Sequence, residues 1–351
     1  MSAEEFLKSI RDSASKISRK IRLMEVCGTH TVSIFRAGIR QLLPKNIELV
    51  SGPGCPVCVT SDDFLDKAIE YSKNPNIIIA TFGDMLRVPG SKSTLRESTG
   101  DIRAIYSPLD SIRIAQENPS KTVIFLAVGF ETTAPTAAAT ILEANRLKLE
   151  NLKFLSAQKL VPPALKILLS DPAAQIDGLL LPGHVAVVTG VKAFEFLQIP
   201  SVVAGFKPDE ILRAIDWLLI RIAENRSEVG NCYESVVRRD GNPQAQKILD
   251  SVYEVADSNW RGLGLIPKSG LKIRQEFERF DVEKIIPIQI PESRPNPNCR
   301  CGEVLRGSII PTDCKLFGKI CKPEHATGPC MASVEGTCSA WFRYGGSHFE
   351  F

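Results

Sequence analysis

Ten cysteines constrain this chain more than any other feature, because nine of them fall into three close groups. Cys27 begins a Cys-Gly-Thr-His-Thr segment, and Cys55 and Cys58 form a Cys-Pro-Val-Cys pair after a Gly-Pro-Gly turn. Thiols gathered this way bind metal, exchange disulfides or form disulfide staples. The third group occupies the tail and contains Cys299, Cys301, Cys314, Cys321, Cys330 and Cys338. Cys232 stands apart, and we expect it to be a buried bystander.

Length and composition narrow the range of chemistry. With 351 residues, 44% of them hydrophobic and 24% charged, we expect a soluble protein of two or three domains. The net charge of +3 and the absence of a basic, aromatic-rich tract argue against nucleic acid as a partner. No secretory signal or membrane-length apolar run is apparent, so we expect a cytoplasmic protein with no membrane contact. Thiols stay reduced there, which favours metal or redox sites over staples.

Up to about residue 230, short apolar runs alternate with amphipathic stretches. The runs lack polar alternation, as expected for parallel strands that are covered on both faces. Long helices are predicted over 208–226 and 243–256. The alternation predicts an α/β fold with parallel sheets. The predicted strands are 22–26, 47–50, 77–81, 104–106, 123–128, 154–156, 178–181 and 201–204.

A weak internal repeat predicts two related α/β domains that face a cleft. Segments 27–31 and 129–133 each follow an apolar strand and precede a helical stretch, so we place the domains at 1–120 and 121–228. A smaller Cys-rich domain, reached through a helical connector, is predicted over 229–351. Its tail is too rich in Cys, Gly and Pro to build a large core alone, so a metal centre would hold it together.

The tail cysteines have a spacing that suits a cluster better than zinc. Their one close pair, Cys299 and Cys301, is separated by a single residue, which is tight for chelating one zinc ion. A cubane iron–sulfur cluster needs four thiolates and tolerates long loops between them. Six cysteines therefore suggest four ligands and a redox-capable pair. A structural zinc site and reduced core cysteines are the alternatives.

The pair Cys55 and Cys58 lies between a predicted strand and a predicted helix. The positive end of a helix lowers a thiol pKa, so we expect an exposed thiolate at this pair. A Cys-x-x-Cys motif in this context is typical of a redox dithiol. Half of a metal site and simple core packing are the other interpretations.

Several polar residues are predicted at the carboxyl ends of strands, where open α/β sheets bind ligands. Cys27 ends the first strand, and His30 is close enough in sequence to assist its thiolate. A strand-end cysteine is often buried packing, but the thiol pair on the next strand–helix turn favours a shared cleft. Asp84, Glu131 and His184 also follow apolar strands beside glycines, where they act either as site residues or as caps and hydrogen-bond partners.

Taken together, these segments resemble the HypD family of [NiFe]-hydrogenase maturation factors. The resemblance covers the chain from about residue 22 to about residue 345, with the motifs in the family's order. The tail contributes Cys301–Gly307 and Gly328–Met331. The α/β part contributes Cys27–Thr31, Gly52–Cys58, Phe82–Gly90, Gly129–Pro135 and Pro182–Val185.

The resemblance implies a [4Fe–4S] protein that works with the small chaperone HypC. Together they would assemble and carry the Fe(CN)2CO unit of the hydrogenase active site, with cyanide supplied by HypE. The finished unit would pass to the hydrogenase large subunit, and the chain would be a monomer when free. The family's cluster spacing, C-x14-C-x6-C-x16-C, falls on Cys299, Cys314, Cys321 and Cys338. It leaves Cys301 and Cys330 as the extra pair, a thiol use similar to that of ferredoxin–thioredoxin reductase.

By the same resemblance, Cys55 and Cys58 form the redox dithiol and Cys27 anchors the iron. Low-spin iron with cyanide and CO ligands needs a soft thiolate. A cluster that reduces one dithiol, which then reduces another near Cys27, would form a relay by thiol–disulfide exchange.

Four further residues would then support the iron site. His30, Asp84 and His184 would orient ligands or donate hydrogen bonds to cyanide nitrogen. Glu335 would hold the cluster loop or a partner, unless it is a solvated turn residue.

Two functions of other classes use the same thiols. An iron–sulfur thiol–disulfide oxidoreductase acting on a protein substrate would need the cluster and the dithiols but not Cys27. A zinc-stapled ligand-binding protein would have no redox role.

Overall fold

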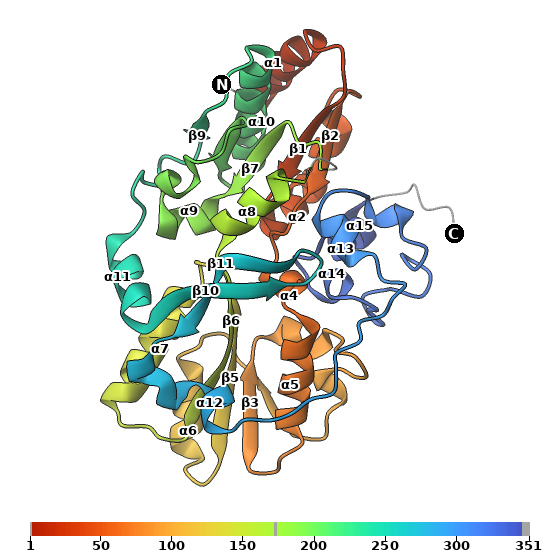
Figure 1. Cartoon of the computed structure of the whole chain (residues 1–351). Helices are drawn as coiled ribbons and strands as arrows, with labels where there is room; N and C mark the ends of the chain where they lie inside the picture. Colours follow the sequence, from red (N-terminus) through yellow and green to blue (C-terminus); the bar gives the residue numbers. More distant parts are fainter. Residues whose placement is uncertain (1, 172–173, 346–351) are drawn as a thin grey trace.

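The computed structural model describes residues 2–171 and 174–345 and confirms the predicted α/β class. Two parallel sheets lie one above the other in Figure 1, with an antiparallel hairpin between them. The Cys-rich tail packs beside the hairpin, against one flank of both sheets. Among the described residues, no helix is long and apolar enough to cross a membrane.

The first sheet has the strand order β2-β1-β7-β8-β9, and all its pairings are parallel. Leu23 and Leu180 pack toward the core beneath α1 and α10, whereas Met24 and Leu181 face the core shared with the tail. This burial on both faces explains the uniformly apolar runs. The strands are β1 (Ile21–Glu25), β2 (Ile47–Ser51), β7 (Gly178–Pro182), β8 (Ser201–Ala204) and β9 (Val229–Asn231), and the helices are α1 (Ala3–Ser15), α2 (Gly28–Arg36), α9 (Gly183–Thr189) and α10 (Pro208–Ala223).

The second sheet has the strand order β4-β3-β5-β6 and is also parallel. The strand predicted at 104–106 is wrong by several residues, because β4 (Asp101–Ala104) pairs its four residues with Ile78–Thr81 of β3. This edge strand carries Asp101 and Arg103 as an ion pair, so it lacks the apolar run that marks the central strands. The other strands are β3 (Ile77–Thr81), β5 (Thr122–Gly129) and β6 (Leu152–Gln158), and the covering helices are α5 (Asp62–Ser72), α6 (Asp110–Glu117) and α7 (Ala134–Arg146).

The sheets do not follow the predicted boundaries at residues 120 and 228. The first sheet combines β1 and β2 with β7, β8 and β9, while the second takes all its strands from the chain between them. The chain therefore crosses between the sheets twice. The first crossing follows β2 and carries α4 (Pro56–Val59), and the second follows β6 and leads into α8 (Val161–Leu169).

The antiparallel hairpin of β10 (Tyr253–Trp260) and β11 (Gly264–Ile273) touches both crossings. Isolated bridges join Trp260 to Thr60 in the first crossing and Gly270 to Lys159 in the second. The Lys159 ammonium also donates to Ser258 Oγ (2.8 Å) and to the Asn259 carbonyl (2.7 Å). Because β10 begins at residue 253, the helix predicted over 243–256 ends earlier, as α11 (Pro243–Val252).

The remaining elements are short. The tail has α13 (Cys301–Leu305), η5 (Pro311–Asp313), α14 (Pro329–Ala332) and α15 (Thr337–Tyr344). Elsewhere lie α3 (Ile39–Leu42), η1 (Gly83–Arg87), η2 (Leu95–Glu97), η3 (Val191–Phe194), η4 (Gln275–Phe280) and α12 (Val282–Ile285).

A buried charge pair attaches the tail helix α15 to the first sheet. The Arg40 guanidinium pairs with the fully buried carboxylate of Glu25. The same guanidinium lies over the rings of Phe35 and Trp341, at 4.7 and 5.6 Å from their centroids. Because Trp341 belongs to α15, the tail completes the burial of this pair, and removing either charge would leave the other buried and unpaired.

Glu131 is a buried carboxyl at the end of β5. One of its oxygens accepts from the Val161 N–H (2.9 Å) at the start of α8, and the other has no hydrogen-bond partner among the described residues. Burial raises the pKa of Glu131 to about 8. The folded chain therefore holds this carboxyl protonated at neutral pH, whereas in the unfolded chain it ionises at about pH 4.3.

We expect Glu131 to make stability fall with rising pH. The protonated folded form contributes fully below the unfolded pKa, and its contribution is lost as pH rises toward about 8. Glu131→Gln stays neutral, so it should be more stable than the wild type at pH 8 by about 2–5 kcal/mol, and about equal at pH 4. Denaturant midpoints measured between pH 4 and 8 test this, and identical pH profiles for the two chains would contradict it.

Candidate functional site

Four candidate residues follow four different parallel strands, and each lies at a carboxyl end. Cys27 caps α2 after β1, Cys55 caps α4 after β2, and Asp84 lies in η1 after β3. His184 is the second residue of α9, which follows β7. Carboxyl ends are where open parallel sheets present their ligand-binding groups. Here the two sheets present them toward the tail segment 330–338.

The Cys27 turn is pressed against the tail at Glu335. Thr29 Oγ1 donates to Glu335 Oε1 (2.7 Å). A Cβ on Gly28 would come within 2.4 Å of the Glu335 carbonyl oxygen, so only glycine permits this approach. Burial raises the pKa of Cys27 to about 11, and the nearby Glu335 carboxylate adds to the effect. Cys27 is therefore a neutral thiol at neutral pH, beside the Glu335 side chain.

Two histidines flank one phenylalanine next to this turn. The Phe206 ring stacks on His30 at 4.6 Å and on His184 at 4.0 Å between centroids. His30 Nε2 lies 2.9 Å from the Gly205 carbonyl oxygen, so this nitrogen carries the proton. Burial lowers the pKa of His30 to about 4 and also lowers that of His184, so both rings are neutral at pH 7. His30 meets the Cys27 sulfur through its backbone N–H rather than its ring.

Ser333, which the sequence did not point to, connects three candidate residues. Its hydroxyl donates to Asp84 Oδ2 (3.0 Å) and accepts from Cys55 Sγ (3.4 Å). The Glu335 backbone N–H also donates to Ser333 Oγ (3.3 Å). A serine in a Cys-rich loop carries no spacing signal of its own, and only its position between Cys330 and Glu335 could have drawn attention to it.

The dithiol pair is buried, so the expectation of an exposed thiolate is wrong. The Cys58 and Cys55 sulfurs lie 2.7 Å apart, and Cys55 Sγ also accepts from the Cys58 N–H (3.3 Å). Burial raises the pKa of Cys58, and the neighbouring thiols Cys330 and Cys55 raise it further. Desolvation therefore outweighs the short helix α4, which has only four residues.

Cys330 joins this pair to the other tail thiols. It contacts Cys301, Cys338 and Cys58, whose thiols donate to it and lower its pKa. The Cys299 and Cys301 sulfurs lie 3.3 Å apart, which continues the series. Together Cys55, Cys58, Cys330, Cys301 and Cys299 form a row of thiols in contact, here called the thiol row.

The tail thiols suit a metal centre by number and by donor type. A Cβ on Gly328 would fall within 2.5 Å of Cys299 Sγ and 2.7 Å of Cys301 Sγ. The two sulfurs therefore fill the space that a side chain at position 328 would need. Cys321 Sγ accepts from the Thr327 N–H (3.3 Å), and Cys314 packs at the edge of the same hydrophobic core. Within residues 2–171 and 174–345, no three His, Cys, Asp or Glu side chains are already arranged as ligands of one ion. Among the described residues, thiol–thiol contacts link Cys299, Cys301, Cys330 and Cys338, so these contacts do not mark out the four ligands that the spacing predicts.

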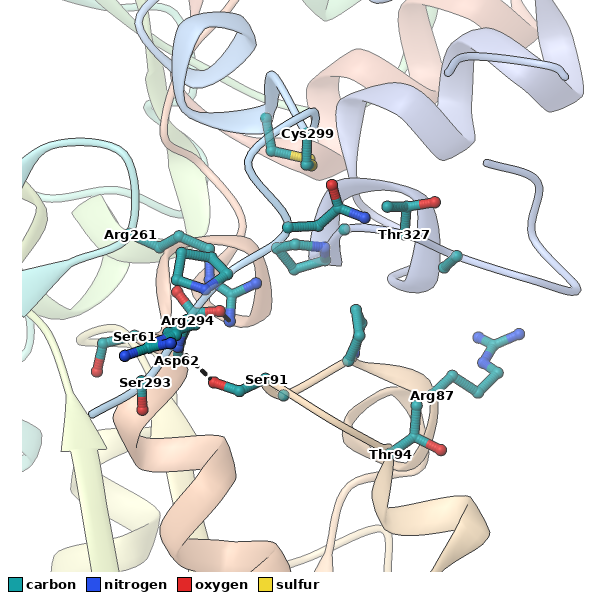
Figure 2. A pocket seen from close by; sticks show the side chains of 18 of the residues that line it. Ser61, Asp62, Arg87, Ser91, Thr94, Arg261, Ser293, Arg294, Cys299 and Thr327 are labelled. Carbon is teal, nitrogen blue, oxygen red and sulfur yellow. Dashed lines mark hydrogen bonds and ion pairs between the residues drawn. The ribbon is translucent and has the colours of Figure 1, made fainter. Parts of the chain in front are cut away.

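An open pocket of about 1900 Å³ adjoins the end of the thiol row. Figure 2 shows Cys299 at one end of it, with Arg261 and Arg294 on one side and Arg87 and Thr94 on the other. Cys301 also lines this pocket.

Cys232 lies apart from the other thiols. It is buried in the core beneath α10, where burial raises its pKa to about 11.

Fold and site define a thiol-rich α/β protein whose two parallel sheets converge on a Cys-rich tail. The HypD family model, described as the hydrogenase formation hypA family, matches residues 1–345. The chain is 41% identical to the hydrogenase maturation factor HypD of Escherichia coli (strain K12), across 97% of this chain and 94% of the relative. It is 39% identical to a putative hydrogenase expression/formation protein of Methanocaldococcus jannaschii, across 96% and 97% respectively.

The chain belongs to the HypD family of hydrogenase maturation factors. This confirms the resemblance drawn from the motifs.

We expect Ser333→Ala to uncouple Asp84 and Cys55 from the tail. The change removes a hydroxyl with three hydrogen-bond partners and leaves Asp84 Oδ2 with the Val334 N–H. It should lower the free energy of unfolding by about 1–3 kcal/mol and speed the reaction of Cys55 with a thiol reagent. Ser308→Ala, at an exposed tail position, is the matched control. Equal thiol reactivity in both variants would show that Ser333 does not hold Cys55.

Proposed function

We propose that this chain is a redox-active scaffold which, with the chaperone HypC, assembles and carries the Fe(CN)2CO unit of the [NiFe]-hydrogenase active site. It would act in the cytoplasm, take cyanide from HypE and serve the hydrogenase large subunit indirectly. The main support is the unbroken contact between the Cys27 turn, the loop at Ser333 and Glu335, and the thiol row.

The Cys27 turn suits an iron cargo. A thiolate is the soft ligand that low-spin iron with cyanide and CO prefers. The thiol pKa of about 11 means that binding of the cation must release the proton. Glu335, which makes a hydrogen bond to Thr29, lies where it can take up that proton. The neutral, exposed His184 ring can donate a hydrogen bond to a cyanide nitrogen.

The tail would hold a [4Fe–4S] cluster at Cys299, Cys314, Cys321 and Cys338, the positions that match the family's spacing. When bound, such a cluster supplies single electrons at low potential. Cys301 and Cys330 would remain as a thiol pair, and their contact in the thiol row supports this role.

The thiol row would carry reducing equivalents from the tail toward Cys27. The Cys330 thiolate, which accepts a hydrogen bond from the Cys301 thiol, attacks a Cys55–Cys58 disulfide at Cys58. Cys55 leaves as a thiolate and takes a proton. Attack by Cys301 on the mixed Cys58–Cys330 disulfide then releases the Cys58 thiol and leaves a Cys301–Cys330 disulfide. Two electrons and two protons reduce that disulfide to two thiols.

A second function keeps the redox parts and omits the iron. An iron–sulfur oxidoreductase acting on a protein substrate would need the thiol row but not Cys27. Burial of Cys55 and Cys58 disfavours it, because a protein disulfide could reach neither sulfur without movement of the tail.

Cys27→Ala separates the two functions. The variant, purified with HypC, should lose the infrared bands of iron-bound cyanide and CO, because the iron loses its soft ligand. It should keep its iron and sulfide content and its dithiol turnover. Cys232→Ala, which also replaces a buried thiol, should keep all of these properties. Bands that persist without Cys27 would overturn its role as the anchor, and their absence from the cluster-loaded wild type would count against the scaffold.

Gly328→Ala should weaken the cluster site. Its Cβ would lie within 2.7 Å of two sulfurs, Cys299 and Cys301, and force them apart. We expect less iron and sulfide per chain and weaker brown absorbance after anaerobic purification. Gly83→Ala is the control, since its Cβ would meet nothing within 4 Å. Full iron content in Gly328→Ala would contradict this placement, and a colourless wild type that contains zinc would favour the zinc-stapled alternative.

A further inference from the structure

The pocket in Figure 2 is an open groove in which the thiol row approaches the protein surface. Cys299 and Cys301 lie at one end of it. Cys299 is partly exposed, whereas Cys301, Cys330 and Cys58 are buried. The walls are formed by segment 87–97, by the hairpin turn 259–264 and by segment 293–298. The opposite end of the row, at Cys55, faces Ser333 inside the molecule.

The acidic groups of the groove are mostly occupied. Four Asp or Glu residues line it, and three of these have partners within the protein. Asp62 pairs with Arg261 (2.7 Å), and Asp63 lies 3.8 Å from the Lys67 ammonium. Glu97 accepts from the Thr94 N–H (2.8 Å) in a capping box. The charges of Asp62 and Asp63 are therefore partly balanced before any partner arrives, whereas Glu97 and Glu324 form no ion pair with the described residues.

The basic groups are largely free. Six Lys or Arg residues line the groove, of which Arg87 and Arg261 are in ion pairs. The other four are exposed and form no ion pair with any residue in the described ranges. They are Lys92, Arg96, Arg294 and Arg343. The groove, here called the basic groove, therefore sets four unpaired basic side chains against two carboxylates without an ion pair, which leaves an excess of positive charge in the groove that Cys299 lines.

The basic groove has a fixed wall. Asp66 accepts from the Ser91 N–H (2.8 Å), from Ser91 Oγ (2.6 Å) and from Ser293 Oγ (2.6 Å). The Arg294 N–H in turn donates to Ser91 Oγ (2.7 Å). The Asp66 carboxylate thus holds segment 293–298 against the segment that carries Lys92, and the backbone of Arg294 is fixed there. The backbone that carries these charged side chains is therefore held in one arrangement, which favours binding of a complementary partner.

We propose that the basic groove is the docking surface for an acidic protein that carries single electrons. The inference rests on the proposed redox function, for which it identifies the reductant. Positive charge around a partly exposed sulfur would steer an acidic carrier so that its redox centre approaches the tail. Two reduced carriers each lose one electron, and with two protons from water they convert a Cys301–Cys330 disulfide into two thiols.

Charge reversal in the full chain tests the surface, with a small acidic [2Fe–2S] ferredoxin as the probe. The groove variant is Lys92→Glu/Arg96→Glu/Arg294→Glu. The control is Lys148→Glu/Lys166→Glu/Lys247→Glu, at exposed lysines outside the groove that form no ion pair within the described chain. Calorimetric titration at low salt should show binding at least about tenfold weaker for the groove variant. The control should stay within about twofold of the wild type, whose affinity should fall as salt is added.

Two results would overturn the docking proposal. One is equal affinity of the groove variant and the control for the ferredoxin. The other is a groove variant that loses affinity for HypC but keeps its affinity for the ferredoxin, which would make the groove a surface for the chaperone. With dithionite as reductant, the groove variant should still form the cyanide and CO bands with HypC, but not with reduced ferredoxin. If even the wild type forms no bands with dithionite, the scaffold function fails, while the ferredoxin affinities still decide the docking proposal.

Discussion

The site depends on the contact between the tail loop at residues 333–336 and the carboxyl ends of the parallel strands. The tail has short helices and no strand of its own among the described residues, so its position comes from what it touches. Gly28 admits the Glu335 carbonyl against the first turn of α2. Ser333 and Asp84 hold the same loop to the second sheet. Without these contacts, nothing would hold the tail cysteines of the thiol row next to Cys27.

Burial governs the chemistry of the thiols more than helix ends do. The short helix α4 places Cys55 at its N-terminus, yet desolvation is the largest cause that raises the pKa of Cys58. A buried dithiol is protected from solvent oxidants and exchanges only with thiols that reach it inside the protein. Cys330, whose pKa other thiols lower, is the thiol in that position. The arrangement favours internal transfer over reaction with a substrate from solution.

The sequence predicted the parts whose signal is local. Strands such as β3 and β5 are buried on both faces, so their apolar runs mark them directly, and the motif cysteines and Asp84 follow such strands. The interleaving of the sheets could not be predicted, because β1 pairs with β7 across more than a hundred residues and nothing in either run specifies its neighbour. Strand β10 was missed because its first residues continue the helical spacing of α11. Ser333 was missed because hydrogen bonding, rather than its residue type, gives it importance.

The interleaved topology also explains where the dithiol lies. A chain that leaves the first sheet after β2 and enters the second at β3 must pass through a crossing segment between them. Cys55 and Cys58 occupy that segment, so the dithiol faces both sheets at once. The hairpin pins the crossing through Trp260, whose indole N–H donates to Ser269 Oγ (2.8 Å) and whose ring stacks on Phe130. Movement of one sheet relative to the other would therefore disturb the dithiol and its contact with Cys330 first. Because the hairpin holds the crossing segment in place, the order of the thiol row depends on a rigid hairpin.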